Sequence, residues 1–509
     1  MTAASNTARV VRTRVRPDLR IVAQAAVPAQ QPSPAPTPLP IDVECARFDL
    51  TDIGNADRFR VRHGNHTRWS PARGWLIWDG RRWCVDDCHQ VLSLAKETAR
   101  LILAEAADAE DQDRRDALAG WAKASGSAGR VSAMLQLARP DVRVPDEGLD
   151  HDTWLLNVLN GTIDLRTGEL RPHNRADLIT KLAPVEYHPE AQCPRWHRFL
   201  QEVFQSDEEL IGYVQRAVGY SLTGLAREQC LFFLFGGGSN GKGVFLVTLR
   251  FVLGDYAQRT KPDVFLEQAR SDSKAATPDL ARMVGVRMII TSEVKDGAAM
   301  AEGLIKELTG EERLTARMLY GQPIEFDPVA KIWFAANHKP IVQGTDHAIW
   351  RRIKMIPFEA TFTAPGDPNH REGNPPKDPN LRHSLRDEAP GILAWAVRGC
   401  LEWQRTGMQE PDVVQAAVAE YRSEQDVLGQ FIDACCVVEP AATVTPADLR
   451  RAYTSWCEER GDIPLGGRRF RAGMIARGFQ QDEGRTNRAT WRGLRLVNPP
   501  RRLFPGIPA

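Results

Sequence analysis

The hydrophobic pattern is clearest between residues 201 and 395, where short apolar runs alternate with stretches of helical periodicity. Three runs have the length and the aromatic or β-branched content of buried strands: "CLFFLF" at 230–235, "VRMIITSE" at 286–293 and "AKIWFAAN" at 330–337. Strands separated by helical segments indicate a parallel sheet with helices on its faces. We therefore predict an α/β domain over residues 201–395.

Residues 45–200 show short alternating strands, turns and helices. Two segments, "GWLIWDGRRWCVDD" at 74–87 and "WLLNVLNGTIDLRTGELRPH" at 154–173, place Asp-Gly, Asn-Gly or Thr-Gly turns between alternating strands, which predicts hairpins. Residues 110–150 follow a helical pattern. This mixture predicts an α+β accessory domain. Residues 1–44 form an Arg-rich and then Pro/Ala-rich tail that we expect to be disordered.

The last part of the chain, residues 396–509, is predicted to be helical with a terminal hairpin. "TVTPADLRRAYTSWCEERG" at 443–461 reads as a capped helix with apolar residues at helical spacing, and "GGRRFRAGMIARG" at 466–478 reads as a second helix. "GRTNRATWRGLRLV" at 484–497 then predicts a β wing. We predict a helical and winged-helix DNA-binding domain here.

The formal net charge is only +1, so nucleic-acid binding can be argued only from the local distribution of charge. Between Gly466 and Arg495 there are eight arginines and two acidic residues, a local charge of +6. Arg468, Arg469 and Arg471 on the second predicted helix are candidate DNA contacts. A solvated basic helix face is the alternative.

Composition places the chain among ordinary soluble proteins, with 42% hydrophobic and 26% charged residues. A run of about eighteen uncharged apolar residues, as a membrane helix needs, does not occur. The nine cysteines are odd in number and scattered, which is typical of a reducing cytoplasm. We expect a cytoplasmic protein that does not contact a membrane.

The chemical signal is strongest directly after "CLFFLF", where a glycine-rich loop joins a predicted strand to a predicted helix. Glycines let backbone N–H groups turn toward phosphate oxygens, and the lysine reaches the terminal phosphates of a nucleotide. A bare glycine turn is the alternative. The predicted ATP-binding residues are Gly236, Gly238, Ser239, Asn240, Gly241, Lys242 and Gly243.

The loop departs from the usual pattern at Gly243, where Ser or Thr normally supplies a hydroxyl to Mg²⁺. Mg²⁺ tolerates few protein ligands, so we still expect ATP and Mg²⁺ to bind. Glu293, at the end of its strand, is the candidate carboxylate that polarises water. Ser292 is a candidate substitute for the missing hydroxyl, with a simple strand end as the alternative.

Two further positions are candidates for catalysis. Asn337 ends its predicted strand and can orient water or sense the γ-phosphate, although it can also be a turn residue. Arg351 and Arg352 precede an apolar strand and can act as arginine fingers on the phosphate of a neighbouring subunit. A solvated surface pair is the alternative for them.

Taken together, the motifs resemble those of the superfamily 3 helicases, in particular the phage and plasmid primase-helicase group that includes the poxvirus primase-helicase. The resemblance extends over most of the chain from about Thr51. It rests on "TDIGNADRF", "GWLIWDGRRW", "LLNVLNGTIDLRTGEL", "GYSLTGLAREQCLFFLFGGGSNGKG", "SEVKDG", "IKELTGEERLTARMLY", "FAANHKP" and "WRRIKMIPF".

The resemblance implies an AAA+ P-loop ATPase core that forms a ring, expected to be a homo-hexamer, and translocates on single-stranded and forked DNA. It assigns Lys242 to phosphate binding, Glu293 to the Walker B carboxylate, Asn337 to the sensor and Arg352 or Arg351 to the finger. It also implies a channel hairpin between the Walker B and sensor strands. Its candidate DNA contacts are Lys306, Arg317 and Lys339, with an ordinary surface hairpin as the alternative.

The expected function is therefore that of an ATP-dependent DNA helicase in phage, prophage or plasmid replication within a bacterial host. Because about 40 residues precede the accessory domain, we expect no primase site of its own and a separate primase or replication-origin factor as partner. A DNA-binding initiator or scaffold with a degenerate ATP site is the second hypothesis. A small-molecule P-loop kinase is a third, disfavoured by the basic C-terminal segment.

Overall fold

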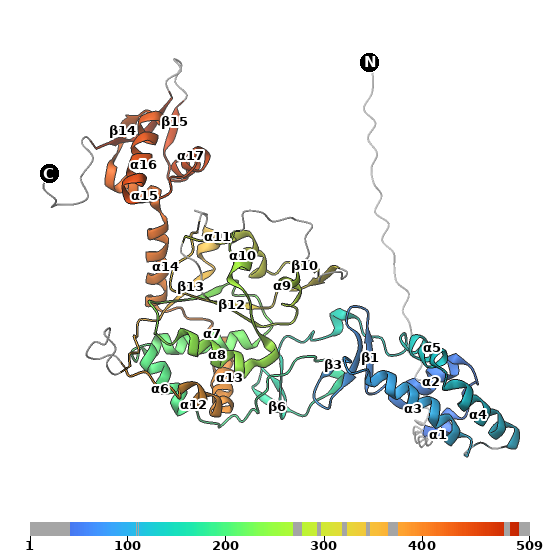
Figure 1. The fold of residues 1–509 in the computed structure, drawn as a ribbon. Coiled ribbons are helices and arrows are strands. Elements are labelled where there is room, and N and C mark those ends of the chain that lie inside the picture. Colours follow the sequence, from blue (N-terminus) through green and yellow to red (C-terminus); the bar gives the residue numbers. More distant parts are fainter. Residues whose placement is uncertain are drawn as a thin grey trace, which may run out of the picture.

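A computed structural model describes residues 41–497 except 108, 110, 268–276, 293–296, 318–322, 343–346, 365–374 and 483–488. Figure 1 shows an N-terminal unit, a central part built around a sheet, and a C-terminal unit that α14 (Asp412–Gln425) connects to the centre.

The N-terminal unit combines helices with a small antiparallel sheet of order β1-β2-β3. Its elements are α1 (Ile41–Cys45), α2 (Asp52–His63), β1 (Thr67–Ser70), β2 (Gly74–Trp78), β3 (Trp83–Val85), α3 (Gln90–Glu105), α4 (Gln112–Ser125) and α5 (Ala128–Ala138). Helix α2 begins after Thr51, whose side-chain oxygen accepts a hydrogen bond from the Gly54 N–H. The fully buried ion pair of Arg58 with Glu105, at 2.8 Å, connects α2 to α3. The first predicted hairpin is confirmed as β2 and β3.

A second small antiparallel sheet, β4-β5-β6, leads into the central part. The elements of this segment are η1 (Asp146–Gly148), β4 (Leu155–Val158), β5 (Gly161–Asp164), β6 (Glu169–Arg171), η2 (Arg175–Asp177), α6 (Pro194–Val203) and α7 (Glu208–Leu222). The second predicted hairpin is confirmed here.

The centre of the molecule is a parallel sheet, as predicted. It has five strands in the order β13-β7-β12-β9-β8. Its strands are β7 (Leu231–Phe235), β8 (Ala257–Arg259), β9 (Met288–Ser292), β12 (Lys331–Ala336) and β13 (Ile353–Pro357). After β7 the chain passes to the β8 edge, returns through β9 and β12, and crosses β7 to reach β13. The strand order therefore changes direction around β7, where open α/β sheets bind ligands beyond their carboxyl ends.

Helices and one hairpin surround this sheet. They are α8 (Lys242–Leu253), η3 (Gly254–Tyr256), η4 (Pro262–Phe265), α9 (Pro278–Ala281), α10 (Glu302–Leu308), β10 (Leu314–Arg317), β11 (Pro323–Phe326), α11 (His347–Trp350), α12 (Leu381–Asp387) and α13 (Ala389–Thr406). The antiparallel pairing of β10 with β11 confirms the hairpin predicted between the second and third apolar strands. Its tip, with Gly321 and Gln322, lies outside the described residues.

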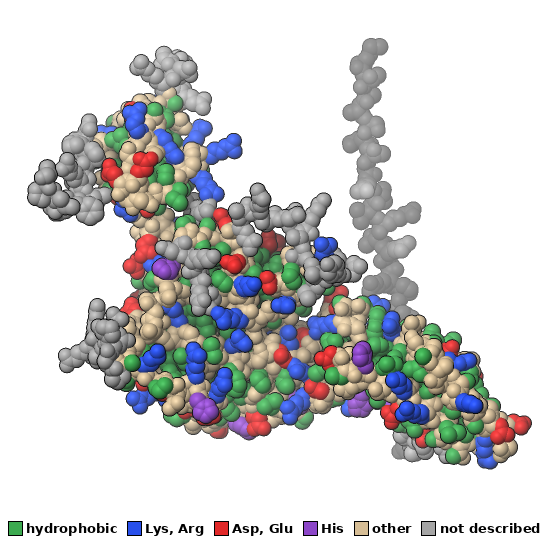
Figure 2. Space-filling model, viewed as in Figure 1, with side chains coloured by type: hydrophobic (Ala, Val, Ile, Leu, Met, Phe, Trp, Pro, Cys, Tyr) green, Lys and Arg blue, Asp and Glu red, His purple; other side chains and the backbone are tan. Residues whose placement is uncertain are grey.

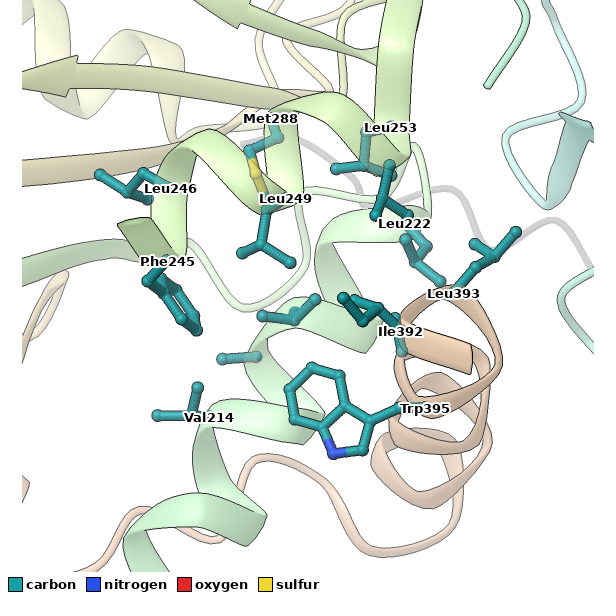
Figure 3. Close-up of a cluster of buried hydrophobic side chains, with 14 of the residues drawn as sticks. Val214, Leu222, Phe245, Leu246, Leu249, Leu253, Met288, Ile392, Leu393 and Trp395 are labelled. Atoms are coloured by element: carbon teal, nitrogen blue, oxygen red, sulfur yellow. The ribbon is translucent and has the colours of Figure 1, made fainter. Parts of the chain in front are cut away.

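Both faces of the sheet are buried, because successive side chains of a strand point to opposite faces. Phe232 and Leu234 of β7 belong to the larger core, whereas Leu231 and Phe233 belong to the core on the other face. Figure 3 shows part of the larger core, where side chains of α7, α8 and α13 meet. This two-sided burial explains why "CLFFLF" is apolar throughout.

The packing differs from the predicted accessory domain over 45–200 at its C-terminal end. Leu156 of β4 and Trp196 of α6 lie in the same core as Phe245 of α8 and Trp395 of α13. The ring of Trp196 stacks on Phe245 and meets Trp395 edge-on, each with centroids 5.5 Å apart. Residues from about 155 onward are therefore part of the central core, because their large apolar side chains complete it.

The C-terminal unit packs three helices with an antiparallel sheet of order β14-β16-β15. Its elements are α15 (Val427–Cys435), β14 (Cys436–Val444), α16 (Pro446–Arg460), α17 (Gly467–Ala476), β15 (Gln480–Asp482) and β16 (Thr490–Leu496). Both predicted helices are present. Strand β14 was not predicted, because Pro440 interrupts the strand pattern of this segment. The pairing of β14 with β16 shifts register between Val438 and Thr443, and a proline is tolerated at such an irregularity.

Candidate nucleotide site and DNA-contact residues

The glycine loop joins the carboxyl end of β7 to the first turn of α8. Gly238 and Gly241 have φ angles of 98° and 88°, in the left-handed region that favours glycine. A Cβ atom at Gly236 would lie 2.2 Å from the Phe358 carbonyl oxygen and 2.3 Å from Asn240 Nδ2. The loop therefore needs glycine at 236 for close approach, and at 238 and 241 for backbone conformation.

Hydrogen bonds hold this loop against the segment that follows β13. The buried Asn240 donates from Nδ2 to the Phe358 carbonyl oxygen at 3.1 Å. The Phe358 N–H donates to the Phe235 carbonyl oxygen, and the Phe362 N–H donates to the Ser239 carbonyl oxygen, both at 2.7 Å. The loop is consequently fixed before any ligand binds.

Lys242 is buried at the N-terminus of α8, and its ammonium group points to the edge of the sheet. Its Nζ donates to the Gly236 carbonyl oxygen and to Asn337 Oδ1, the latter at 3.0 Å. Burial lowers the pKa of Lys242 to about 8, since desolvation disfavours the charged form. Both acceptors are neutral, so an anion beside this ammonium group would be strongly favoured.

The ends of three parallel strands meet at this edge. Phe235 of β7 pairs with Ala336 of β12, directly before Asn337, and Ala335 of β12 pairs with Ser292 of β9. The structure therefore brings Asn337 to Lys242 and places the end of β9 one strand further along. The side chain of Ser292 and the whole of Glu293 lie outside the described residues.

Gly243, the position that lacks the usual hydroxyl, lies in open space. A Cβ atom there would meet nothing within 4 Å, and its backbone is not among the positive-φ positions. Packing therefore does not require glycine at 243.

The two candidate finger arginines occupy different environments. Arg352 is 8% exposed, and it donates to Thr309 Oγ1 at 3.0 Å and to the Ala348 carbonyl oxygen at 2.7 Å. Arg351 is exposed and donates to Gln229 Oε1 at 2.7 Å. Of the two, only Arg351 is positioned to reach another molecule.

The three candidate DNA contacts of the central part are dispersed. Lys306 is half-buried on α10, and Arg317 is exposed at the end of β10, before the tip of the hairpin. Lys339 forms an ion pair with Glu424 of α14 at 2.7 Å, and its Nζ lies 4.7 Å from the centre of the Phe235 ring. Lys339 is thus next to the glycine loop, whereas Arg317 belongs to the hairpin.

In the C-terminal unit, Arg468, Arg469 and Arg471 are all exposed on α17. Figure 2 shows Lys and Arg side chains gathered on the side of this unit where α17 lies. The helix is anchored by Phe470 and Met474, which are buried in the core of the unit. The arginines are consequently presented outward from a packed helix.

A cavity of about 550 Å³ beside the glycine loop was missed by the sequence reasoning. Gly236, Gly237, the ends of β7 and β13, and α14 form its walls. The α14 side chains that line it, Val413, Ala416, Ala417 and Glu420, are spaced as one face of a helix. That spacing was the available signal, but it does not tell which surface the helix faces.

Two family models match the chain. The model described as "D5 N terminal like" matches residues 56–205, and the one described as "Family of unknown function (DUF5906)" matches residues 234–352. A "Putative helicase L207/L206" of Acanthamoeba polyphaga mimivirus is 30% identical over 297 residues, which are 56% of this chain and 30% of that protein. A "Putative primase C962R" of African swine fever virus (isolate Tick/Malawi/Lil 20-1/1983) is 23% identical over 327 residues, 60% of this chain and 34% of that protein.

These matches are consistent with the D5-like primase-helicase family that the motifs resemble. A "Putative helicase 022R" of Frog virus 3 (isolate Goorha) extends this set, with 27% identity over 304 residues, 58% of this chain and 31% of that protein. The match with these relatives thus spans about a third of their own length.

The first family match covers nearly the same residues as the predicted accessory domain, although the core divides the chain earlier. Among solved structures, the apo C-terminal region of NrS-1 is 12% identical to this chain. The match covers 60% of this chain and 76% of that chain. Its TM-score of 0.38 is too low to establish a common fold. None of the described helices combines the length and apolar character of a membrane span.

Proposed function

We propose that this D5-like protein is an ATP-dependent DNA helicase of superfamily 3, with an AAA+ ATPase core and a winged-helix C-terminal unit. The observation that carries the proposal is the contact of Lys242 with Asn337 at 3.0 Å, beside a preformed glycine loop. It joins a phosphate-binding lysine to a polar group on the neighbouring strand. Relatives named as putative helicases and primases support DNA replication as the setting. Phage, prophage or plasmid DNA in a bacterial host is the setting that we propose.

In this proposal the loop N–H groups and Lys242 bind the phosphates of ATP, and Asn337 senses the γ-phosphate. Glu293 polarises the attacking water, and Mg²⁺ supplies charge stabilisation when bound. Ser292 and Glu293 would hold Mg²⁺, because position 243 offers no hydroxyl. The open surroundings of Gly243 fit this reading, because the site has room for water where the hydroxyl is missing.

The cavity beside the loop is the proposed site for the base and ribose of ATP. Its walls include the apolar side chains of Phe235, Met355 and Val413 together with the polar Thr361 and Glu420. Its volume of about 550 Å³ is in the range of small-molecule sites. Because the cavity meets the loop at Gly236 and Gly237, a nucleotide can occupy both at once.

Ring assembly and DNA contact complete the proposal. Arg351 contacts the γ-phosphate of ATP bound to a neighbouring subunit in a homo-hexamer. Arg352 instead stabilises the fold of its own subunit through hydrogen bonds to Thr309 and Ala348. The β10–β11 hairpin, with Arg317 and Lys306, contacts single-stranded DNA in the channel, and Arg468, Arg469 and Arg471 contact the duplex of a fork. Such phosphate contacts carry no sequence information, as a motor requires. Lys339, engaged by Glu424, contributes less in this arrangement. A separate primase as partner remains a prediction.

The decisive experiment measures ATP turnover of the full chain with and without single-stranded DNA, together with unwinding of a forked duplex. We expect DNA-stimulated turnover and unwinding, and loss of both in Lys242→Ala, with DNA binding retained. If wild-type protein binds DNA without any ATP turnover, the scaffold hypothesis motivated by Gly243 replaces the motor. Gly243→Ser serves as a second variant, and a lower Mg²⁺ requirement is expected for it.

A further inference from the structure

A second cavity, of about 310 Å³, lies in the N-terminal unit and is lined mainly by polar groups. We call it the arginine cavity, after Arg60 at the end of α2, Arg68 on β1 and Arg143 in the segment after α5. Its other lining residues are Gly64, Asn65, Asp141 and Val142. The family match of this region describes no ligand, and the proposed ATP and DNA contacts lie elsewhere in the chain.

Backbone hydrogen bonds build this cavity from three segments. The Trp69 N–H donates to the Val142 carbonyl oxygen at 3.0 Å, and the Val144 N–H donates to the Trp69 carbonyl oxygen at 2.9 Å. This parallel bridge places Arg143 opposite Trp69, next to β1. Helix α2 ends at Gly64, whose N–H donates to the Arg60 carbonyl oxygen at 2.8 Å. The arginines are thus held together by the backbone rather than by shared acidic partners.

The charge of the cavity is largely uncompensated. Arg68 donates from Nη1 to the carbonyl oxygens of Thr67 and Gly64, which are neutral acceptors. Among the described residues, the one carboxylate within ion-pair range of Arg60 is that of Asp57, 3.9 Å away and partly exposed, and such a pair contributes little. Among the described residues, three arginines and one carboxylate residue, Asp141, therefore line the cavity.

A fourth guanidinium group adds to this field. Arg175 donates from Nη1 to the Asn65 carbonyl oxygen at 3.0 Å. Burial, and next the like charge of Arg175, lower the pKa of Arg68. Arg68 stays protonated because its reference pKa is so high, and an anion in the cavity would relieve this repulsion.

We propose that the arginine cavity binds a backbone phosphate of single-stranded DNA. Guanidinium groups recognise phosphate oxygens through paired hydrogen bonds. Three arginines from separate segments line this one cavity, which suits an anion. The described residues of the lining include no aromatic ring to receive a nucleotide base, which favours the phosphate of a polymer over ATP. The inference builds on the proposed DNA substrate and adds a contact in the N-terminal unit, distinct from the hairpin and from α17.

The test uses the full chain without nucleotide and a fluorescent oligo-dT strand, whose affinity is measured by anisotropy at several salt concentrations. Arg60→Glu and Arg143→Glu are combined, and Arg68 is left intact because it also bonds the end of α2. We expect the affinity to fall by about tenfold or more, and the magnitude of the slope of log K against log salt to fall by about 0.7, the value for one phosphate contact on a single strand. Arg100→Glu, an exposed arginine on α3, is the matched control.

The outcomes separate this inference from the proposed function. If the wild-type protein does not bind oligo-dT, the DNA-motor proposal fails first. If it binds, and the double variant has the affinity and salt slope of Arg100→Glu, the arginine cavity does not contact DNA. Calorimetry of inorganic phosphate with Lys242→Ala protein forms the second arm. Saturable phosphate binding that the double variant abolishes, with DNA affinity unchanged, would assign the cavity to a small free anion instead.

Discussion

In the proposed nucleotide site, Lys242 would couple ATP binding to pH. Its pKa of about 8 means that the free protein loses the ammonium charge above that pH, whereas a bound phosphate would favour the charged form. We therefore expect ATP affinity to be constant below about pH 8 and to fall by at most about tenfold per pH unit above it. The Kd for ATP, measured between about pH 7.5 and 9.5, checks this.

The matching control for this titration is Lys242→Met, which has no charge to lose. Its affinity is expected to be low at every pH, with no break near the lysine pKa. A wild-type Kd that stays level across the whole range would show that Lys242 does not bind the phosphates in its charged form.

Replacing each of the two adjacent arginines is expected to have a different effect on the protein. Arg351→Ala removes an exposed side chain, so we expect an unchanged melting temperature and an unchanged ATP affinity. We expect ATP turnover to fall by about a thousandfold, which is the lower end of the range of effects of an arginine finger. Arg352→Ala removes a buried side chain with two hydrogen bonds, so we expect a loss of stability of about 1–3 kcal/mol. Thermal unfolding and ATPase assays distinguish the two.

Subunit mixing extends this comparison. Arg351→Ala subunits keep an intact loop, and Lys242→Ala subunits keep an intact arginine. If the finger acts on the neighbouring subunit, mixing these two inactive proteins restores part of the activity. Failure of every ratio to restore turnover, with mixed rings demonstrated, would place Arg351 outside the site.

At the scale of elements, α14 lines the cavity beside the glycine loop and so contributes to the proposed nucleotide site. Ala416 is exposed on this helix and lines the cavity, so Ala416→Trp fills part of the cavity without entering the core. We expect the Kd for ATP to rise by about tenfold, which corresponds to a loss of about 1.4 kcal/mol of binding free energy. Ala419→Trp, at another exposed position of the same helix outside the cavity lining, should leave it unchanged. Equal affinities in both variants would mean that the base lies elsewhere.

The sequence predicted the elements around the loop well, because each is encoded locally. The apolar run of β7, the glycines and the periodicity of α8 are contiguous, and the hairpin β10–β11 has its own alternating pattern. The role of α14 and the separate environments of Arg351 and Arg352 could not be predicted in this way. They depend on which residues far apart in the chain pack together, such as Arg352 with Thr309.

At the scale of the whole molecule, the same limit explains where the chain divides. Alternating strands and turns continue to about residue 173, so the sequence suggested one accessory domain ending near 200. The structure instead gives residues 41–150 small cores of their own and places Trp196, Phe199 and Leu200 in the central core. A domain boundary is set by these long-range contacts, and local periodicity does not record them.

This division predicts how truncated proteins behave. A fragment starting at residue 150 keeps α6, whereas one starting at 206 loses Trp196, Phe199 and Leu200 and exposes their partners Phe245 and Trp395. Each buried large apolar side chain is worth about 1.5–3 kcal/mol, so removing three costs as much as many domains have in total stability. We expect a cooperative thermal transition for the longer fragment and aggregation of the shorter one. If the fragment from 206 melts cooperatively at the same temperature, α6 is an attachment to the central core rather than part of it.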